Sequence, residues 1–261
     1  MSYTHLLVDR TEAIVTITIN RREKLNALSE AVLKELLELC TKLSARGDVR
    51  GMLLCGAGDR AFVAGADISR MREMSVDEGV AFGRLGQQAA DSIEALPFPV
   101  IACVQGFALG GGCELAMAAD YIYATEAAVF GQPEVNLGLV PGFGGLVRLI
   151  RLVGPGRAKE LIYTGRNVDA SEALRIGLVN AVFSTRKEMM AAATASLLLA
   201  AARSPVAVAA CKDVLRSLDG KSTAAQLSLE NAAFGRVFAS EDKREGVTAF
   251  VEKRRPTFAG R

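Results

Sequence analysis

The order of strand-like and helix-like segments is the feature that most limits how this chain can fold. Short runs of apolar or β-branched residues, which are typical of strands, alternate with helical patterns in the first half. From Gly142 onward the strand signals nearly vanish, so we expect an α/β chain with a helical C-terminal part. The predicted strands are residues 13–20, 51–58, 100–104 and 121–125, and the predicted helices are residues 29–43, 76–96, 188–202, 204–218, 222–239 and 241–254.

Composition and the two ends of the chain argue against several classes of partner. The 261 residues carry a formal net charge of +2, and basic residues do not interleave with aromatic ones, so we expect no nucleic-acid partner. The longest apolar run, residues 189–202, is too short to span a bilayer, and the N-terminus lacks a signal-peptide pattern. The five cysteines form no CxxC pair. We therefore expect reduced, buried thiols in a cytoplasmic protein without a membrane partner.

A single histidine, His5, excludes much catalytic chemistry. A Ser-His-Asp triad, a Cys-His dyad or a histidine-based metal site would each need it, and we expect it at the surface beside a strand. We expect no metal site. Catalysis in this chain therefore falls to carboxylates, backbone amides or a bound cofactor.

Three glycines precede a glutamate in the stretch "FALGGGCELA", residues 107–116. Glycines between a strand and a helix let the backbone approach a ligand, and the first N–H groups of the helix are free to bind an oxygen that gains negative charge. Glu114 falls in the first turn of that helix. The non-functional alternative is that Glu114 only interacts favourably with the helix dipole and that the glycines only permit tight packing.

Two further stretches carry candidate groups. In "AFVAGADI", residues 61–68, an apolar run enters a turn of small residues where an exposed N–H is a second donor. In "FGQPEVNLG", residues 130–138, Pro133 restricts the backbone and aims Glu134 in one direction. An ordinary loop and a solvated glutamate are the corresponding non-functional alternatives.

Taken together and in this order, the three stretches resemble the signature segments of the crotonase (enoyl-CoA hydratase/isomerase) family. The resemblance continues in "NRREKLNALS", "GRNVDASEALRIGLVN" and "SEDKREGVTAFVEKRRPTF", and so covers essentially the whole chain, nearest to bacterial short-chain enoyl-CoA hydratases. One departure is "LVRL" at residues 146–149, where relatives usually have Thr-Gln-Arg-Leu; it bears on local packing. The implied fold is a spiral of β-β-α units at residues 1–200, followed by a helical trimerisation region at residues 201–261.

The resemblance also implies a set of site residues. The amides of Ala64 and Gly111 would form an oxyanion hole for a thioester carbonyl, and Glu114 and Glu134 match the two catalytic glutamates. The acyl-CoA contacts implied are Ala64, Gly65, Ala66, Asp67, Ile68 and Gly111, with Phe250 and Lys253 across a subunit boundary. Coenzyme A is part of the substrate, and no separate cofactor is expected. A homotrimer or a dimer of trimers is implied.

The implied reaction is reversible addition of water across the C2=C3 bond of a 2-trans-enoyl-CoA, in acyl-CoA degradation. Glu114 would activate the water, and Glu134 would supply the proton to C2. Several alternatives stay open at this point. They are an enoyl-CoA isomerase, a hydratase for a branched or dicarboxylic substrate such as 3-methylglutaconyl-CoA (with Arg70, Arg72 or Arg84 at the distal carboxylate), an RNA-binding relative and a non-catalytic acyl-CoA binder.

Overall fold

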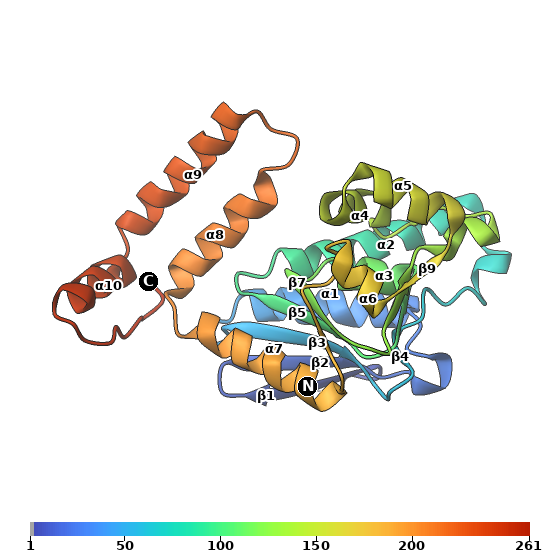
Figure 1. The fold of residues 1–261 in the computed structure, drawn as a ribbon, viewed down its shortest axis with the longest axis horizontal. Helices are drawn as coiled ribbons and strands as arrows, with labels where there is room; N and C mark the ends of the chain where they lie inside the picture. The colour runs from blue at the N-terminus through green and yellow to red at the C-terminus, as the bar shows by residue number, and fades with distance from the viewer. Residues whose placement is uncertain (1–2) are drawn as a thin grey trace.

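Two sheets form the body of the molecule in the computed structural model, which describes residues 3–261 (Figure 1). The larger sheet has the strand order β1-β2-β3-β5-β7-β10, in which β1 and β2 are antiparallel and the other neighbours are parallel. Its strands are Leu6–Thr11, Ile14–Ile19, Gly51–Gly56, Val100–Val104, Tyr121–Thr125 and Ala181–Phe183, in the order of the sheet.

The smaller sheet has the order β4-β6-β8-β9, with β4, β6 and β8 parallel and β9 antiparallel to β8. Consecutive strands go to different sheets, because β3 is followed by β4, β5 by β6 and β7 by β8. Helix α2 follows the first pair and α3 the second, so the predicted spiral of β-β-α units is confirmed. The four short strands are Ala61–Val63, Phe107–Leu109, Val129–Gly131 and Asn167–Asp169.

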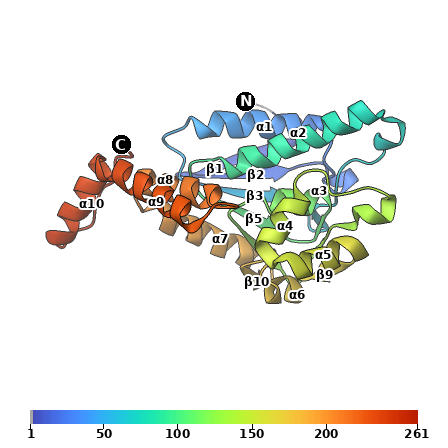
Figure 2. The same cartoon turned by 90° about the horizontal axis from the view of Figure 1, so that it is seen from above.

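Helices cover both faces of the larger sheet. Figure 2 shows α1 (Glu30–Ser44) and α2 (Val76–Glu94) on one side and α7 (Arg186–Ala201) on the other. Alternate residues of β3 therefore enter different cores, with Met52 and Leu54 facing α1 and Leu53 and Cys55 facing α7. Both faces being covered explains why this parallel strand reads as a continuous apolar run.

The remaining helices are short or lie at the C-terminus. Figure 1 shows α8 (Pro205–Ser217) and α9 (Thr223–Phe238) side by side in an arm that leaves the body, with α10 (Glu241–Val251) at its end. The arm exposes large apolar side chains, namely Leu215, Leu227, Phe234, Phe238, Val247, Phe250 and Val251. The division at residue 200 and the role of the arm in a trimer stay predictions. The other elements are η1 (Arg22–Lys24), η2 (Met71–Glu73), α3 (Gly111–Ala116), η3 (Pro133–Leu137), α4 (Gly145–Val153), α5 (Pro155–Thr164) and α6 (Ala170–Arg175).

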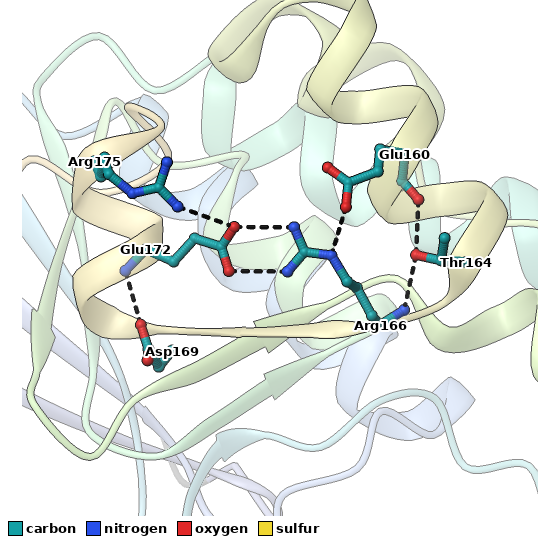
Figure 3. Close-up of polar contacts among 6 residues, drawn as sticks. All are labelled: Glu160, Thr164, Arg166, Asp169, Glu172 and Arg175. Carbon is teal, nitrogen blue, oxygen red and sulfur yellow. Dashed lines mark hydrogen bonds and ion pairs between the residues drawn. The ribbon is translucent and has the colours of Figure 1, made fainter.

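An ion-pair cluster at the surface fastens α5, β9 and α6 together (Figure 3). The guanidinium of Arg166 binds both carboxylate oxygens of Glu172, at 2.8 and 2.9 Å, and Oε1 of Glu160 at 2.7 Å. Asp169 caps α6 by accepting from the Glu172 amide at 2.7 Å. A two-pronged arginine–carboxylate pair fixes orientation as well as distance, so the cluster sets how α6 follows β9.

The structure tests the expectation that the cysteines are buried. Four cysteines are buried, but Cys211 is exposed on α8, so the expectation that all five are buried is wrong for that residue; all five are free thiols.

In residues 3–261 no single helix is long and apolar enough to cross a membrane, although α7 and α8, bent by 108° at their junction, pass the same test as a pair by length and composition.

Candidate active site

The three sequence stretches meet because three parallel strands end at one edge of the smaller sheet. β4 ends at Val63, before residues 64–68; β6 ends at Leu109, before the glycines; and β8 ends at Gly131, before Glu134. The carboxyl ends of parallel strands are a common place for a binding crevice. A cavity of about 590 Å³ lies there, and its polar lining includes Glu114 and Glu134.

Each of the three consecutive glycines is required by a different neighbour. A Cβ on Gly112 would collide with the carbonyl oxygen of Val63, and one on Gly110, whose φ is +48°, would lie 2.5 Å from Oε1 of Glu134. A Cβ on Gly111 would lie 3.0 Å from the ring of Phe143. The glycines thus let α3 start close to β4, Glu134 and Phe143, which accounts for their conformational cost.

Two backbone amides at this edge have no hydrogen-bond partner among residues 3–261. Gly111 is the first residue of α3, so its N–H has no acceptor within the helix. The amide nitrogen of Ala66 lies 3.5 Å from the position that a Cβ on Gly111 would take. Among residues 3–261, no backbone hydrogen bond outside the helices and sheet ladders uses either N–H group. The two donors are therefore free and adjacent.

The structure does not leave the predicted donor Ala64 free. Its N–H donates to the carbonyl oxygen of Leu25 at 3.1 Å, although the residue does line the cavity. The prediction of Ala64 as a donor is therefore wrong in this structure, and Ala66 takes its place beside Gly111. The motif alone could not separate them, because the acceptor for Ala64 comes from a segment far away in the sequence.

Glu114 is held rigidly inside the protein. Its side chain lies in the first turn of α3 and is 1% exposed. Oε1 accepts from the amides of Phe143 at 2.7 Å and Gly145 at 2.6 Å. Burial raises the pKa of the Glu114 carboxyl to about 7; the charge of Glu134 adds to this rise, and the two amides and Arg148 oppose it. A pKa near neutral suits a general base or acid at physiological pH.

Glu134 faces the same cavity from a short helix. Pro133 starts η3 and Gly138, with a φ of +70°, ends it, so Glu134 sits in a single fixed turn. Its Oε2 is buried and has no hydrogen-bond partner among the described residues. Burial raises the pKa of this carboxyl as well. A buried, unpartnered carboxyl oxygen in a cavity is ready to bind a water molecule or a substrate proton.

The other predicted contacts are divided. Gly65, Ala66 and Ile68 line the cavity, but Asp67 does not, because its carboxylate binds Arg21 at 3.1 Å and the hydroxyl of Ser69 at 2.5 Å. The prediction of Asp67 as a substrate contact is therefore not supported by the geometry of this chain.

The two residues predicted near the C-terminus do not reach the cavity in this chain. Phe250 belongs to α10, which Figure 1 shows at the opposite end of the molecule from β4 and α3, and Lys253 follows that helix. Phe250 is 84% exposed. Their role in a neighbouring subunit's site stays a prediction.

An aromatic wall was not among the site residues predicted from the sequence. Phe82 on α2 and Phe143 contact edge to face, with ring centroids 5.3 Å apart, and both line the cavity. Gly86, in the middle of α2, leaves room for the Phe143 ring. A glycine inside an otherwise regular helix was the sequence signal for such a close approach. The rest of the wall is mainly apolar and includes Met71, Met74, Val80 and Leu139.

Positive charge is absent from the described lining. No Lys, Arg or His belongs to it, and Arg70, Arg72 and Arg84, considered above for a distal carboxylate, are exposed residues outside it. Residues 3–261 also contain no group of three or more His, Cys, Asp or Glu side chains arranged to hold a metal ion. The chemistry available at the cavity is therefore that of two carboxyl groups and two amides beside an apolar wall.

Comparison with known proteins decides the family. A model of the enoyl-CoA hydratase/isomerase family matches residues 9–261, nearly the whole chain. The chain belongs to this family. The chain is 45% identical over 255 residues to a short-chain-enoyl-CoA hydratase of Clostridium acetobutylicum, covering 98% of this chain and 97% of that protein. It is 43% identical to a crotonyl-CoA hydratase of Syntrophomonas wolfei, with 99% of each chain covered.

Solved structures of the family agree with the fold. The crystal structure of an enoyl-CoA hydratase from Bacillus anthracis superposes with a TM-score of 0.95 at 37% identity, covering 99% of this chain and 100% of the other. The resemblance found in the sequence motifs is thus confirmed for both family and fold. Members of this enoyl-CoA hydratase/isomerase family act on acyl-CoA substrates.

Proposed function

We propose that this chain is a hydro-lyase that adds water reversibly across the C2=C3 bond of short 2-trans-enoyl-CoA thioesters, giving 3-hydroxyacyl-CoA. The observation that carries the proposal is that one cavity holds two carboxyl groups with raised pKa values beside two unpartnered amides. The relatives named as short-chain-enoyl-CoA and crotonyl-CoA hydratases support the same substrate class. Coenzyme A enters as part of the substrate, and no other cofactor is proposed.

The amides of Ala66 and Gly111 act on the thioester carbonyl. Attack of water at C3 moves electron density onto the carbonyl oxygen in an enolate-like transition state. Donors that are already in place where this charge develops stabilise the transition state more than the ground state, and removing one such donor typically costs roughly 3–4 kcal/mol. Because Gly111 starts α3, the end of that short helix adds a partial positive charge to the same oxygen.

The two carboxyl groups move the protons. We assign Glu114 to accept the proton of the attacking water, because the Phe143 and Gly145 amides favour its ionised form. Glu134 then supplies the proton to C2. Protons on two coupled carboxyl groups belong to the pair, so the reactive form is best described as a pair that shares one proton.

The assembly is part of the proposal. The apolar side chains of the arm would be covered if copies of the chain form a trimer or a dimer of trimers, which agrees with the tendency of the fold to oligomerise. In such an assembly Phe250 and Lys253 would meet the coenzyme A of a neighbouring site. Light scattering of the purified protein gives the number of copies directly, and a monomer at micromolar concentration contradicts this part.

Loss of the enoyl absorbance of crotonyl-CoA measures the activity. We expect Glu114→Gln and Glu134→Gln each to lower kcat by well over tenfold, whereas the exposed Glu126→Gln leaves it unchanged. A loss below tenfold for either buried glutamate contradicts a required pair.

The alternatives are tested in parallel with the same protein. Turnover of 3-methylglutaconyl-CoA above that of crotonyl-CoA, or double-bond migration in a 3-enoyl-CoA as the main activity, would replace short-chain hydration as the function. Retention of a uridine-rich oligonucleotide on a filter would indicate the RNA-binding alternative.

A further inference from the structure

Arg148 is a buried charge that the proposed reaction does not use. Three charged side chains are buried in the described part of the chain, Glu114, Arg148 and Asp242, and Arg148 is the only cation. It lies on α4, outside the cavity lining. Burying a guanidinium is costly unless its charge is paired and its donors are bonded, so its contacts indicate what the residue is for; among the described residues only its Nε lacks a partner.

The guanidinium joins α2 to the turn that holds Glu114. Nη2 binds Oδ1 of Asp91 at 2.6 Å and Oε2 of Glu94 at 2.9 Å. Nη1 donates to the carbonyl oxygen of Phe143 at 2.9 Å. Burial opposes the charged form, but the two carboxylates outweigh it and raise the pKa of Arg148, so the side chain stays a cation.

The turn at residues 143–145 presents its other side to Glu114. The amides of Phe143 and Gly145 both bind Oε1 of Glu114, so the carbonyl of Phe143 is fixed by Arg148 and its N–H by the catalytic carboxyl. Gly144, between them, has a φ of +106°, and a Cβ there would collide with Nη1 of Arg148. Turn and guanidinium are therefore built to fit each other.

We propose that Arg148 is a positioning residue for Glu114: bound to the α2 carboxylates, it holds the Phe143–Gly145 turn in the orientation that directs two amides at one oxygen of Glu114. With Oε1 held in this way, Oε2 is the oxygen left to meet the attacking water. This inference rests on the proposed hydration, in which Glu114 is the base. Without Arg148 the Phe143 carbonyl loses its donor, and the turn is free to rotate away from Glu114.

A double-mutant cycle on the full-length chain tests this role. We expect Arg148→Met to lower kcat for crotonyl-CoA by about tenfold while KM changes by less than about twofold, because the displaced group acts on the water and not on coenzyme A. In the Glu114→Ala background, the same substitution should lower kcat by less than about twofold. That background keeps a measurable rate, because bound substrate and the amides still act.

Two further variants keep the outcome decisive. Arg166→Met also removes an arginine held by two carboxylates, but one without contact to residues 143–145, and should leave kcat unchanged. Arg148→Lys keeps the buried charge and cannot reach both the α2 carboxylates and the Phe143 carbonyl, so an intermediate loss is expected; it replaces the Met variant if that variant does not fold.

The results separate this inference from the proposed function. If the wild-type chain does not hydrate crotonyl-CoA, or if Glu114→Ala keeps full activity, the proposed function is wrong. Suppose instead that the wild type hydrates crotonyl-CoA and that Glu114→Ala loses activity. If Arg148→Met then lowers kcat by the same factor with and without Glu114, or does not lower it, Arg148 is only structural and the present inference is overturned.

Discussion

The ring of Phe143 fills the space that Gly86 leaves open on α2. A Cβ on Gly86 would overlap the Cδ1–Cε1 edge of the ring, and the Cδ2–Cε2 edge lies against Gly111. The ring also contacts Phe82 of α2. The ring is thus fixed beside Gly111, and the backbone of Phe143 belongs to the turn that holds Glu114. Because it lines the cavity beside Glu114 and Gly111, we expect its volume to limit the acyl chain that the cavity admits.

The first prediction concerns chain length. Phe143→Ala should raise kcat/KM for an eight-carbon enoyl-CoA relative to crotonyl-CoA by roughly tenfold, since the apolar space next to the reacting carbons increases. Phe98→Ala removes a buried ring that is not part of the lining, so it should destabilise the fold without changing this ratio. An unchanged ratio in the Phe143 variant would mean that the acyl chain leaves the cavity in another direction.

The second prediction concerns stability and pH. The Glu114 carboxyl has a pKa of about 7 in the fold and an ordinary value of 4.5, so the folded chain binds the extra proton between these values and loses stability as pH rises through them. The resulting loss in the free energy of unfolding, about 3 kcal/mol, is complete above pH 7 and absent below pH 4.5. The unfolding temperature of Glu114→Gln should therefore rise relative to that of the wild type as pH increases from 4.5 to 8. A constant gap over this range contradicts the raised pKa, and Glu126→Gln serves as the exposed control.

The third prediction concerns Asp67, which the geometry makes a support for Ala66 and not a ligand. Asp67 binds Arg21 through its carboxylate, and its amide donates to the Leu28 carbonyl at 2.8 Å, while the Leu28 amide donates to Gly65 at 2.9 Å. Asp67→Asn weakens this clamp around the Ala66 amide, so we expect kcat to fall by about threefold to tenfold with KM nearly constant. A rise in KM alone would restore Asp67 as a substrate contact.

The fourth prediction compares two glycines. Gly112→Ala places a methyl group against the Val63 carbonyl and should destabilise the fold by more than about 3 kcal/mol, or prevent folding. Gly79→Ala, in α2 with nothing within 4 Å of its Cβ, should stabilise the fold by roughly 0.5–1 kcal/mol. Chemical denaturation of the two variants measures both effects, and similar values would contradict the close approach of α3 to β4.

The sequence predicted most of the long elements, because each of these contains its own signal. The strand β1, which is exposed from residue 7 to residue 11, was not among them. The buried run at residues 100–104 is β5, and the helix expected at residues 76–96 is Val76–Glu94, which starts with a capping box between Ser75 and Glu78. The strands of the smaller sheet have three residues each, too few for an apolar pattern to stand out, and β9 and β10 lie where strand signals were nearly absent. Their existence depends on partners elsewhere in the chain.

The residues of the candidate site also differ in whether a local sequence pattern predicts them. Glu114, Glu134 and Gly111 follow directly from motifs, because Gly111 and Glu114 come just after β6 and Glu134 just after β8. Which amide near Ala64 is free depends on Leu25 and Leu28, and no local pattern contains that information. The same holds for Arg148, whose partners Asp91 and Glu94 are more than 50 positions away.

The two donors that we propose for the thioester carbonyl belong to the main chain, and this has an evolutionary consequence. No point substitution deletes an N–H group, except one to proline, so mutation at the strand ends leaves the polarised carbonyl in place while it exchanges the side chains around it. A fold of this kind can continue to stabilise an enolate while single substitutions introduce a different proton donor or nucleophile.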